Sequence, residues 1–205
     1  MAFAKDHLYE RRLGKVQKKS KKGIVLSAVL YLLMFILASS CGLIHPACYA
    51  YVGTLVPLLF SFVYLYTAAN MQCFGAAAVL NGFVLIVGLI AGEGNPAMIT
   101  GLILLAAIAE IIRKSIGYNT LKGVELSFIP FAFSFYAYTA HWWTNTEESL
   151  AEAVEEMRPG YSDLMQSVIG NTTVLIIMLI LTVPVAILGM KIAEKTIKKQ
   201  ASTLK

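Results

Sequence analysis

Long stretches of apolar residues without a single charge dominate the pattern along this chain. No Asp, Glu, Lys or Arg occurs over residues 23–92, and the stretches 94–109, 126–146 and 164–190 are equally free of charge. About 20 consecutive apolar residues are enough for a helix to cross a bilayer. The polarity does not alternate from residue to residue, as it does in the strands of a membrane barrel. The pattern therefore predicts an all-α membrane protein that crosses the bilayer several times.

Six membrane spans fit the positions at which these stretches are interrupted. The clearest interruption runs from Gly92 to Pro96, where the proline suits the first position of the following helix. The six predicted transmembrane helices cover residues 24–40, 47–69, 74–91, 96–112, 124–141 and 164–192. Together they form one transmembrane domain over residues 24–192, with a basic arm over 1–23 before it and a basic tail over 193–205 after it.

The basic residues gather on one side of this six-span arrangement. If the N-terminus is cytoplasmic, the inner segments are 1–23, 70–73, 113–123 and 191–205, and they hold 16 of the 17 Lys and Arg residues, with Arg158 as the exception. Cytoplasmic loops of membrane proteins carry an excess of basic residues, so we expect both termini to be cytoplasmic. A cleaved N-terminal signal peptide is the competing interpretation, and it would leave five helices.

A short amphipathic helix is predicted on the outer side, between the fifth and sixth spans, over residues 144–158. Thr144 and Glu147 form a capping-box pattern at its start. Four apolar residues at helical spacing predict one apolar face opposite a group of glutamates. These four are Leu150, Ala153, Val154 and Met157. Such a helix either floats at the interface as a connector or covers a binding site, and the pattern leaves both interpretations open.

The amino-acid composition argues against an enzymatic function. Charged residues make up 14% of the chain and hydrophobic residues 58%, whereas catalysis within a membrane needs ionisable groups that are costly there. No metal-ligand cluster, nucleophile motif or ATP-binding loop occurs in the sequence. We therefore expect no enzyme, no catalytic residue, no metal and no cofactor. Glu110, in the fourth span, is expected to pair with Arg113 or Lys114 one turn later.

The basic arm over residues 1–23 is expected to contact membrane lipids, because each basic residue near an anionic surface contributes about 1 kcal/mol. Nucleic acid is not an expected partner, since a membrane anchor already accounts for this charge. Cys41 and Cys48 both fall near the first outer turn. An oxidising exterior would allow them to pair, and the sequence leaves this open.

With catalysis disfavoured, we expect the chain to bind a small ligand in a cavity that opens outward. Aromatic residues recur toward the outer end of the fifth span, and aromatic walls with a few polar groups suit a small planar ligand. The residues expected to bind substrate are Tyr138, His141, Trp142, Glu93, Asn95, His45 and Asn81. Two alternatives stay open, because Trp and Tyr also mark the membrane interface and Asn81 also suits a hydrogen bond between helices.

Several short motifs resemble those of one known family. They are Gly101, Ala109-Glu110, Arg113-Lys114, Gly117-Tyr118, Lys122-Gly123 and Leu126-Ser127-Phe128, followed by a basic C-terminal ending. This set is similar to the Trep_Strep family of S components of energy-coupling-factor (ECF) transporters. The resemblance implies capture of a small micronutrient or vitamin-like substrate at the outer face of a prokaryotic plasma membrane. It also implies two kinds of partner, a transmembrane coupling subunit and two ABC-type ATPases, which drive delivery inward.

The resemblance further implies a surface that docks to the coupling subunit. S components often carry an Ala-x-x-x-Ala pattern on the first helix, and this chain has Gly23 and Ser27 as a small-residue pair in its place. We expect Gly23, Ser27 and Ala28 to form the docking surface. A stand-alone small-molecule permease or channel is the alternative function, and it would transport without any ATPase. A small intramembrane enzyme is a third class, disfavoured by the thin supply of acids, bases and nucleophiles.

Overall fold

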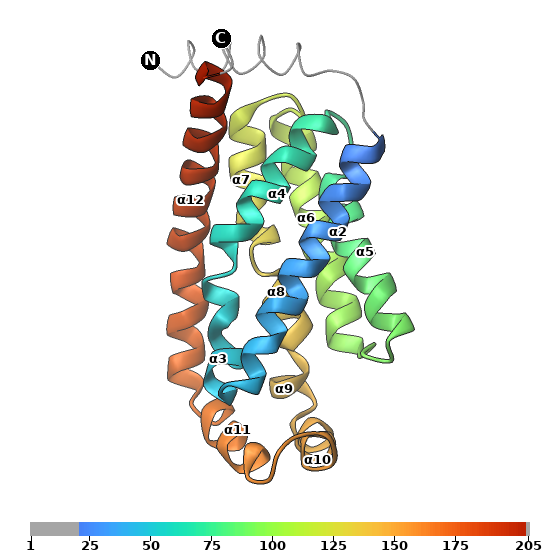
Figure 1. The fold of residues 1–205 in the computed structure, drawn as a ribbon, viewed down its shortest axis with the longest axis vertical. Coiled ribbons are helices and arrows are strands. Elements are labelled where there is room, and N and C mark those ends of the chain that lie inside the picture. Colours follow the sequence, from blue (N-terminus) through green and yellow to red (C-terminus); the bar gives the residue numbers. More distant parts are fainter. Residues whose placement is uncertain (1–20, 204–205) are drawn as a thin grey trace.

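The computed structural model describes residues 21–203, in which every regular element is a helix (Figure 1). In chain order these are α2 (Lys21–Ser39), the 3-10 turn η1 (Ser40–Leu43), α3 (Pro46–Tyr51), the 3-10 turn η2 (Val52–Thr54), α4 (Pro57–Asn70), α5 (Ala76–Ile90), α6 (Pro96–Ile116), α7 (Leu121–Phe131), α8 (Ser134–Thr139), α9 (His141–Thr144), α10 (Thr146–Glu156), α11 (Tyr161–Ile169) and α12 (Thr172–Thr203). The absence of strands from this described range confirms the all-α prediction. Most of the basic arm lies outside the described residues.

Proline and capping side chains mark where two of these helices begin. Pro96 opens α6, and the Asn95 side chain accepts a hydrogen bond from a backbone N–H of the first turn at 2.8 Å. Pro46 opens α3, and Nδ1 of His45 accepts a backbone N–H at 3.1 Å. Both caps satisfy donors that have no partner within the helix. The break predicted before Pro96 is confirmed, and α3 begins within the gap predicted between residues 40 and 47.

The long helices run side by side as a bundle whose two ends differ (Figure 1). The start of α2 and the end of α12 lie at one end, together with the α4–α5 and α6–α7 connections. The short helices α9, α10 and α11 gather at the opposite end, which we call the α9–α11 end. In the orientation expected from the charge pattern, the α9–α11 end faces outward.

Aromatic side chains fill the centre of the bundle. Tyr31 of α2 packs against Phe60 of α4 with ring centroids 4.6 Å apart, and Tyr64 of α4 packs against Phe131 of α7 at the same distance. All four side chains are fully buried. Aromatic pairs contribute about 0.5–1.5 kcal/mol beyond their buried area. The rings therefore hold α2, α4 and α7 around one shared core.

Length and composition support three to four membrane spans. Three segments are long and apolar enough by themselves, namely Lys22–Leu43, Pro96–Ile116 and Thr172–Ile197. Pro46–Thr54 and Pro57–Asn70 make a fourth candidate, bent by 43°. α5 is apolar but has only 15 residues, and the fifth predicted span is divided between α7 and α8. The count of six therefore stays a prediction.

The structure corrects the bounds of the last two predicted spans. Pro130, which lacks a backbone donor, lies in the last turn of α7, and regular helix resumes only at Ser134 and ends at Thr139. The helix that contains the sixth predicted span begins at Thr172 and not at residue 164, because the preceding residues form the separate helix α11. The side chain of Asn171 accepts a backbone N–H at 3.2 Å and so marks a new helix start.

Apolar side chains cover the outside of the bundle as well as its core. On α2 more than half of the surface of several large apolar residues is exposed, while Ala28, Tyr31 and Phe35 on the other face are buried. The exposed residues are Val25, Leu26, Leu33, Ile36 and Leu37. Contiguous apolar surface is unusual on a protein in water. This surface supports a membrane location.

The amphipathic helix α10 forms where it was expected, with two differences in detail. Thr144 belongs to α9 and its hydroxyl donates to the carbonyl of Ala140, so it makes no capping box with Glu147. Ala153 is buried, but Val154 is 68% exposed. Successive residues of an α-helix are about 100° apart around its axis. Val154, next to the buried Ala153, therefore lies outside the narrow buried face.

Candidate functional site

A cavity of about 210 Å³ lies at the α9–α11 end, and we call it the α10 cavity. Its walls come from the end of α2, from η1, α3 and α8, and from the loop between α5 and α6, and α9, α10 and α11 complete it. Segments that are far apart in sequence thus meet around one space. Four of the residues expected to bind substrate line it, namely Tyr138, His141, Trp142 and Glu93.

Aromatic side chains from three helices form the apolar wall of the α10 cavity. The rings of Tyr49 on α3 and Trp142 on α9 meet edge to face, with centroids 6.2 Å apart. Tyr138 on α8 packs in the same way on Phe35 of the bundle core at 5.8 Å. Because the wall is anchored to the core, its rings are oriented before a ligand arrives, which lowers the entropy cost of binding.

Carboxylates supply the charge of the α10 cavity. Glu93 accepts a hydrogen bond from the Tyr138 hydroxyl at 3.5 Å. Glu152 and Glu156 of α10 also line the cavity, one helical turn apart. No Lys or Arg stands among the described residues that line it. The lining therefore has a net negative charge at neutral pH.

His141 joins the wall of the cavity to α10. Its Nδ1 lies 2.8 Å from the hydroxyl oxygen of Ser149, a hydrogen bond in which either group can donate. His141 belongs to α9, beyond the long helices of the bundle, and burial lowers the pKa of its imidazole to about 4. The side chain is therefore neutral at physiological pH. It offers a hydrogen bond to the cavity and adds no positive charge.

Tyr161 of α11 lines the cavity and carries a buried hydroxyl without a hydrogen-bond partner among the described residues. The residue is 2% exposed. Gly42 lies directly against it, since a Cβ at Gly42 would stand 3.4 Å from this oxygen. A buried hydroxyl without a partner costs free energy. A ligand with a hydrogen-bonding group would recover that cost.

Sequence reasoning does not identify Tyr49, Tyr161, Glu152 or Glu156 as cavity residues. The spacing of the two glutamates is a signal that they share one side of α10, but the pattern favours a solvated face for them. Tyr49 and Tyr161 lie on short helices, and no local pattern shows what those helices pack against.

Three residues expected to bind substrate lie outside the α10 cavity. His45 and Asn95 are used as helix caps. Asn81 is buried in the bundle, where it accepts a hydrogen bond from the Tyr31 hydroxyl at 3.0 Å and donates one to the Leu102 carbonyl at 3.1 Å. For Asn81 the alternative of an interhelical hydrogen bond is confirmed, since it connects α2, α5 and α6.

Gly23, Ser27 and Ala28 lie inside the bundle and not on its surface. The Ser27 hydroxyl donates to the Gly23 carbonyl at 2.8 Å, and Ser27 and Ala28 are only 2% and 4% exposed. A docking surface has to be accessible to its partner. The structure therefore contradicts the expectation that these three residues form one, and the accessible face of α2 carries the large apolar residues.

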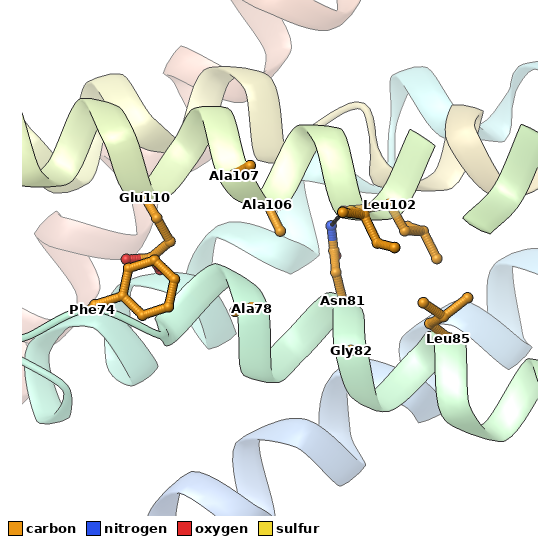
Figure 2. Close-up of a pocket in the computed structure, with 10 residues that line it drawn as sticks. Phe74, Ala78, Asn81, Gly82, Leu85, Leu102, Ala106, Ala107 and Glu110 are labelled. Carbon is orange, nitrogen blue, oxygen red and sulfur yellow. Dashed lines mark hydrogen bonds between the residues drawn. The ribbon is translucent and has the colours of Figure 1, made fainter. Parts of the chain in front are cut away.

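A second cavity, of about 220 Å³, lies between α5 and α6 (Figure 2). Its lining is apolar apart from Asn81 and Glu110. Figure 2 shows Glu110 on α6 beside Phe74, and Asn81 on α5 facing Leu102 farther along the same seam. Both polar groups have a structural role, because each forms a hydrogen bond that connects α5 to α6.

Glu110 and Arg113 form a buried ion pair near the end of the bundle that lies opposite the α9–α11 end. Nη1 of Arg113 lies 3.4 Å from Oε1 of Glu110, and this oxygen also accepts the N–H of Ala77 in the first turn of α5 at 2.8 Å. Arg113 donates to two carbonyl groups at the end of α4, at 3.2 and 2.8 Å. Each charge thus faces a helix end of opposite partial charge. The pairing expected for Glu110 is confirmed, with Arg113 as its partner.

Neither a metal site nor a disulfide bond is visible in the described part of the chain. No group of three or more His, Cys, Asp or Glu residues suited to a metal ion occurs there. Cys41 and Cys48 are both free.

Comparison with known proteins finds one family. The sequence model of a family described as "hypothetical bacterial integral membrane protein (Trep_Strep)" matches residues 23–202. The matched range includes every helix from α3 to α11 and nearly all of α2 and α12. No curated protein and no solved structure matches the chain.

Proposed function

The chain belongs to the Trep_Strep family of bacterial integral membrane proteins, and on this premise we propose that it is the substrate-capture (S) component of an ECF-type uptake transporter. In this role it binds a small micronutrient or vitamin-like molecule at the outer face of the plasma membrane. Separate chains, a transmembrane coupling subunit and two ABC-type ATPases, deliver the molecule inward. The chain itself acts as a binding protein and not as an enzyme.

The α10 cavity is the observation that carries this proposal. Its combination of aromatic walls and a few polar groups is typical of small-molecule sites. Its volume of about 210 Å³ suits a small ligand, since a cavity of about 150 Å³ holds one benzene ring. The cavity lies at the end of the bundle that faces outward in the expected orientation, where a capture protein has to meet its substrate.

α10 serves as the cover of the site in this proposal. Its Ser149 is joined to His141 of the wall, and its Ala153 packs into the small apolar cluster that Trp142 and Tyr161 form at this end of the bundle. The turn that leads from α10 to α11 passes through Gly160, whose φ of +80° favours glycine. Movement of α10 away from this cluster would open a route for the substrate.

The proposal includes the full count of six spans. α5 is about 22 Å long, shorter than a hydrocarbon core of about 30 Å, and a bilayer thins locally around a short span. The break between α7 and α8 is tolerable at membrane depth because the backbone N–H groups of Ala132 and Phe133 donate to the carbonyls of Phe128 and Pro130, and Ala132 is fully buried in protein. Irregular backbone is excluded only where it meets lipid.

Purification from the native host tests the proposed function. The tagged chain, solubilised in mild detergent, should bring with it two ABC-type ATPases and one further membrane protein, identified by mass spectrometry. A tagged membrane protein of unrelated function from the same host is the control. Recovery of the chain without ATPases, repeated after crosslinking, would contradict the proposal and favour a stand-alone permease.

A further inference from the structure

The charges around the α10 cavity indicate the class of ligand it binds. Glu93, Glu152 and Glu156 line the space, and no basic side chain stands among its described lining residues. Arg158 lies in the turn after α10 and donates to the Ile44 carbonyl at 3.2 Å, outside this lining. An anionic ligand would therefore meet net repulsion, whereas a cation would be attracted by three carboxylates.

The uncharged groups of the lining also suit a cation with a small apolar body. Tyr49, Tyr138 and Trp142 present aromatic rings, and the faces of such rings attract ammonium groups. The buried Tyr161 hydroxyl still lacks a hydrogen-bond partner. The volume leaves room for about one ring and a short substituent.

We propose that the α10 cavity binds a small organic cation, in which an ammonium group is joined to an apolar body of about one ring. This rests on the proposed function, because it names the ligand class of the same capture site. The Tyr161 hydroxyl forms a hydrogen bond with the ligand, and the aromatic wall surrounds its apolar body.

The positions of the carboxylates connect binding of the cation to closure of the site. Glu93 belongs to the loop between α5 and α6, whereas Glu152 and Glu156 belong to the cover α10. Without a ligand, these like charges on two elements repel each other. A cation between them is attracted to both elements and holds α10 against the bundle. The acidic face of α10 therefore makes closure depend on the charge of the ligand.

Three probes of similar shape and different charge test this inference. The purified full-length chain is titrated in detergent by calorimetry with 2-phenylethylammonium, with neutral 2-phenylethanol and with anionic phenylacetate. We expect the cation to bind, the alcohol to bind at least about tenfold more weakly, and the anion to show no binding. Added salt should weaken binding of the cation, because screening reduces attraction between exposed charges.

A matched pair of double variants tests which carboxylates are responsible. Glu152→Gln with Glu156→Gln should weaken binding of the cation by about tenfold or more and leave the alcohol unchanged. Glu147→Gln with Glu155→Gln removes the same charge from the same helix at positions outside the lining and should have a much smaller effect. Equal weakening by both pairs would indicate a diffuse surface effect and would overturn the proposal.

The outcomes separate a wrong ligand class from a wrong function. Equal or tighter binding of the alcohol or of phenylacetate, lost in Trp142→Ala, would overturn the cationic class and leave the capture site in place. Failure of the cation to bind at all would also overturn the cationic class. The proposed function fails by a different result, the absence of ATPases from the purified assembly.

Discussion

Arg113 is fully buried, and its charge is balanced at the ends of two helices. The guanidinium meets carbonyl groups at the end of α4, while its partner Glu110 meets the first turn of α5. These contacts also determine how the chain turns from α4 into α5. The positive φ of +125° at Gly75 completes that turn. The pair therefore stabilises the arrangement of three helices and takes no part in the α10 cavity.

Replacing Arg113 should destabilise the protein strongly. Arg113→Ala leaves the carboxylate of Glu110 buried without its partner, and breaking a buried ion pair in this way costs about 3–5 kcal/mol. Lys114→Ala is the matched control, because Lys114 is exposed and its removal should change stability by less than about 0.5 kcal/mol. Chemical unfolding in detergent measures both. Similar midpoints for the two variants would contradict this role of Arg113.

His141 should make the stability of the α9–α11 end depend on pH. Its folded-state pKa of about 4 lies below the ordinary value of 6.5, so between these values the unfolded chain binds more protons than the folded one. Stability linked to His141 is therefore complete above about pH 6.5 and is lost as the pH falls toward 4. Comparing thermal unfolding at pH 7 and pH 4.5 measures the loss.

Two histidine variants isolate this contribution. His141→Asn retains a group that can hydrogen-bond to Ser149 but has no proton to take up, so it should lose less stability on acidification than the parent chain. His45→Asn, at an exposed helix cap, should keep the full pH dependence. An unchanged pH dependence in His141→Asn would show that other groups cause it.

At the scale of elements, glycine determines how closely α12 approaches α4. A Cβ at Gly189 would stand 2.8 Å from the carbonyl oxygen of Pro57 and 3.1 Å from Cα of Leu58. Both are backbone atoms, so relief would require the helices to move apart. Gly82 on α5 differs, because a Cβ there meets nothing within 4 Å.

The same substitution at these two glycines should have different effects on stability. Gly189→Ala should destabilise the protein by about 1–3 kcal/mol, the usual cost of overpacking. Gly82→Ala should be neutral or stabilise by up to about 1 kcal/mol, because alanine favours the helix. Unfolding midpoints in one detergent compare the two variants directly. A stabilised Gly189→Ala variant would mean that α4 and α12 do not meet so closely in the membrane.

At the scale of the whole molecule, the two ends of the bundle differ in structure. The α9–α11 end holds the α10 cavity, and the opposite end holds the turn that Arg113 stabilises. Cys48 and Cys73 are both exposed, and the six-span arrangement puts Cys48 at the outer boundary of the second span and Cys73 in an inner connection. These native thiols are therefore probes of the topology.

Thiol labelling should separate the two sides. In intact cells, a membrane-impermeant maleimide should label a variant that keeps only Cys48, whereas a variant that keeps only Cys73 should react only after permeabilisation. The six predicted spans leave residues 41–46 outside and 70–73 inside, so Cys48 lies at the outer boundary of the second span and Cys73 in an inner connection. Equal labelling of both variants in intact cells would contradict the proposed topology.

The apolar stretches alone determine that this chain is helical and belongs in a membrane, because in lipid every backbone amide needs a partner within the protein and the polarity does not alternate as it does in barrel strands. Local chemistry also determines several helix starts, as at Pro96 and Pro46, and the pairing of Glu110 one turn from Arg113. Aromatic spacing identifies Tyr138 and Trp142 as cavity residues. Each of these inferences rests on residues close together in sequence.

Only the tertiary structure decides which face of each helix points inward. α2 is apolar on all sides, because one face meets lipid and the other meets the core. Its sequence pattern therefore does not show which face is buried in the bundle. Gly23, Ser27 and Ala28 are therefore buried where a surface was expected. Tyr49, Tyr161 and the glutamates of α10 lie far apart in sequence. They become neighbours only because short helices from distant parts of the chain pack at the α9–α11 end.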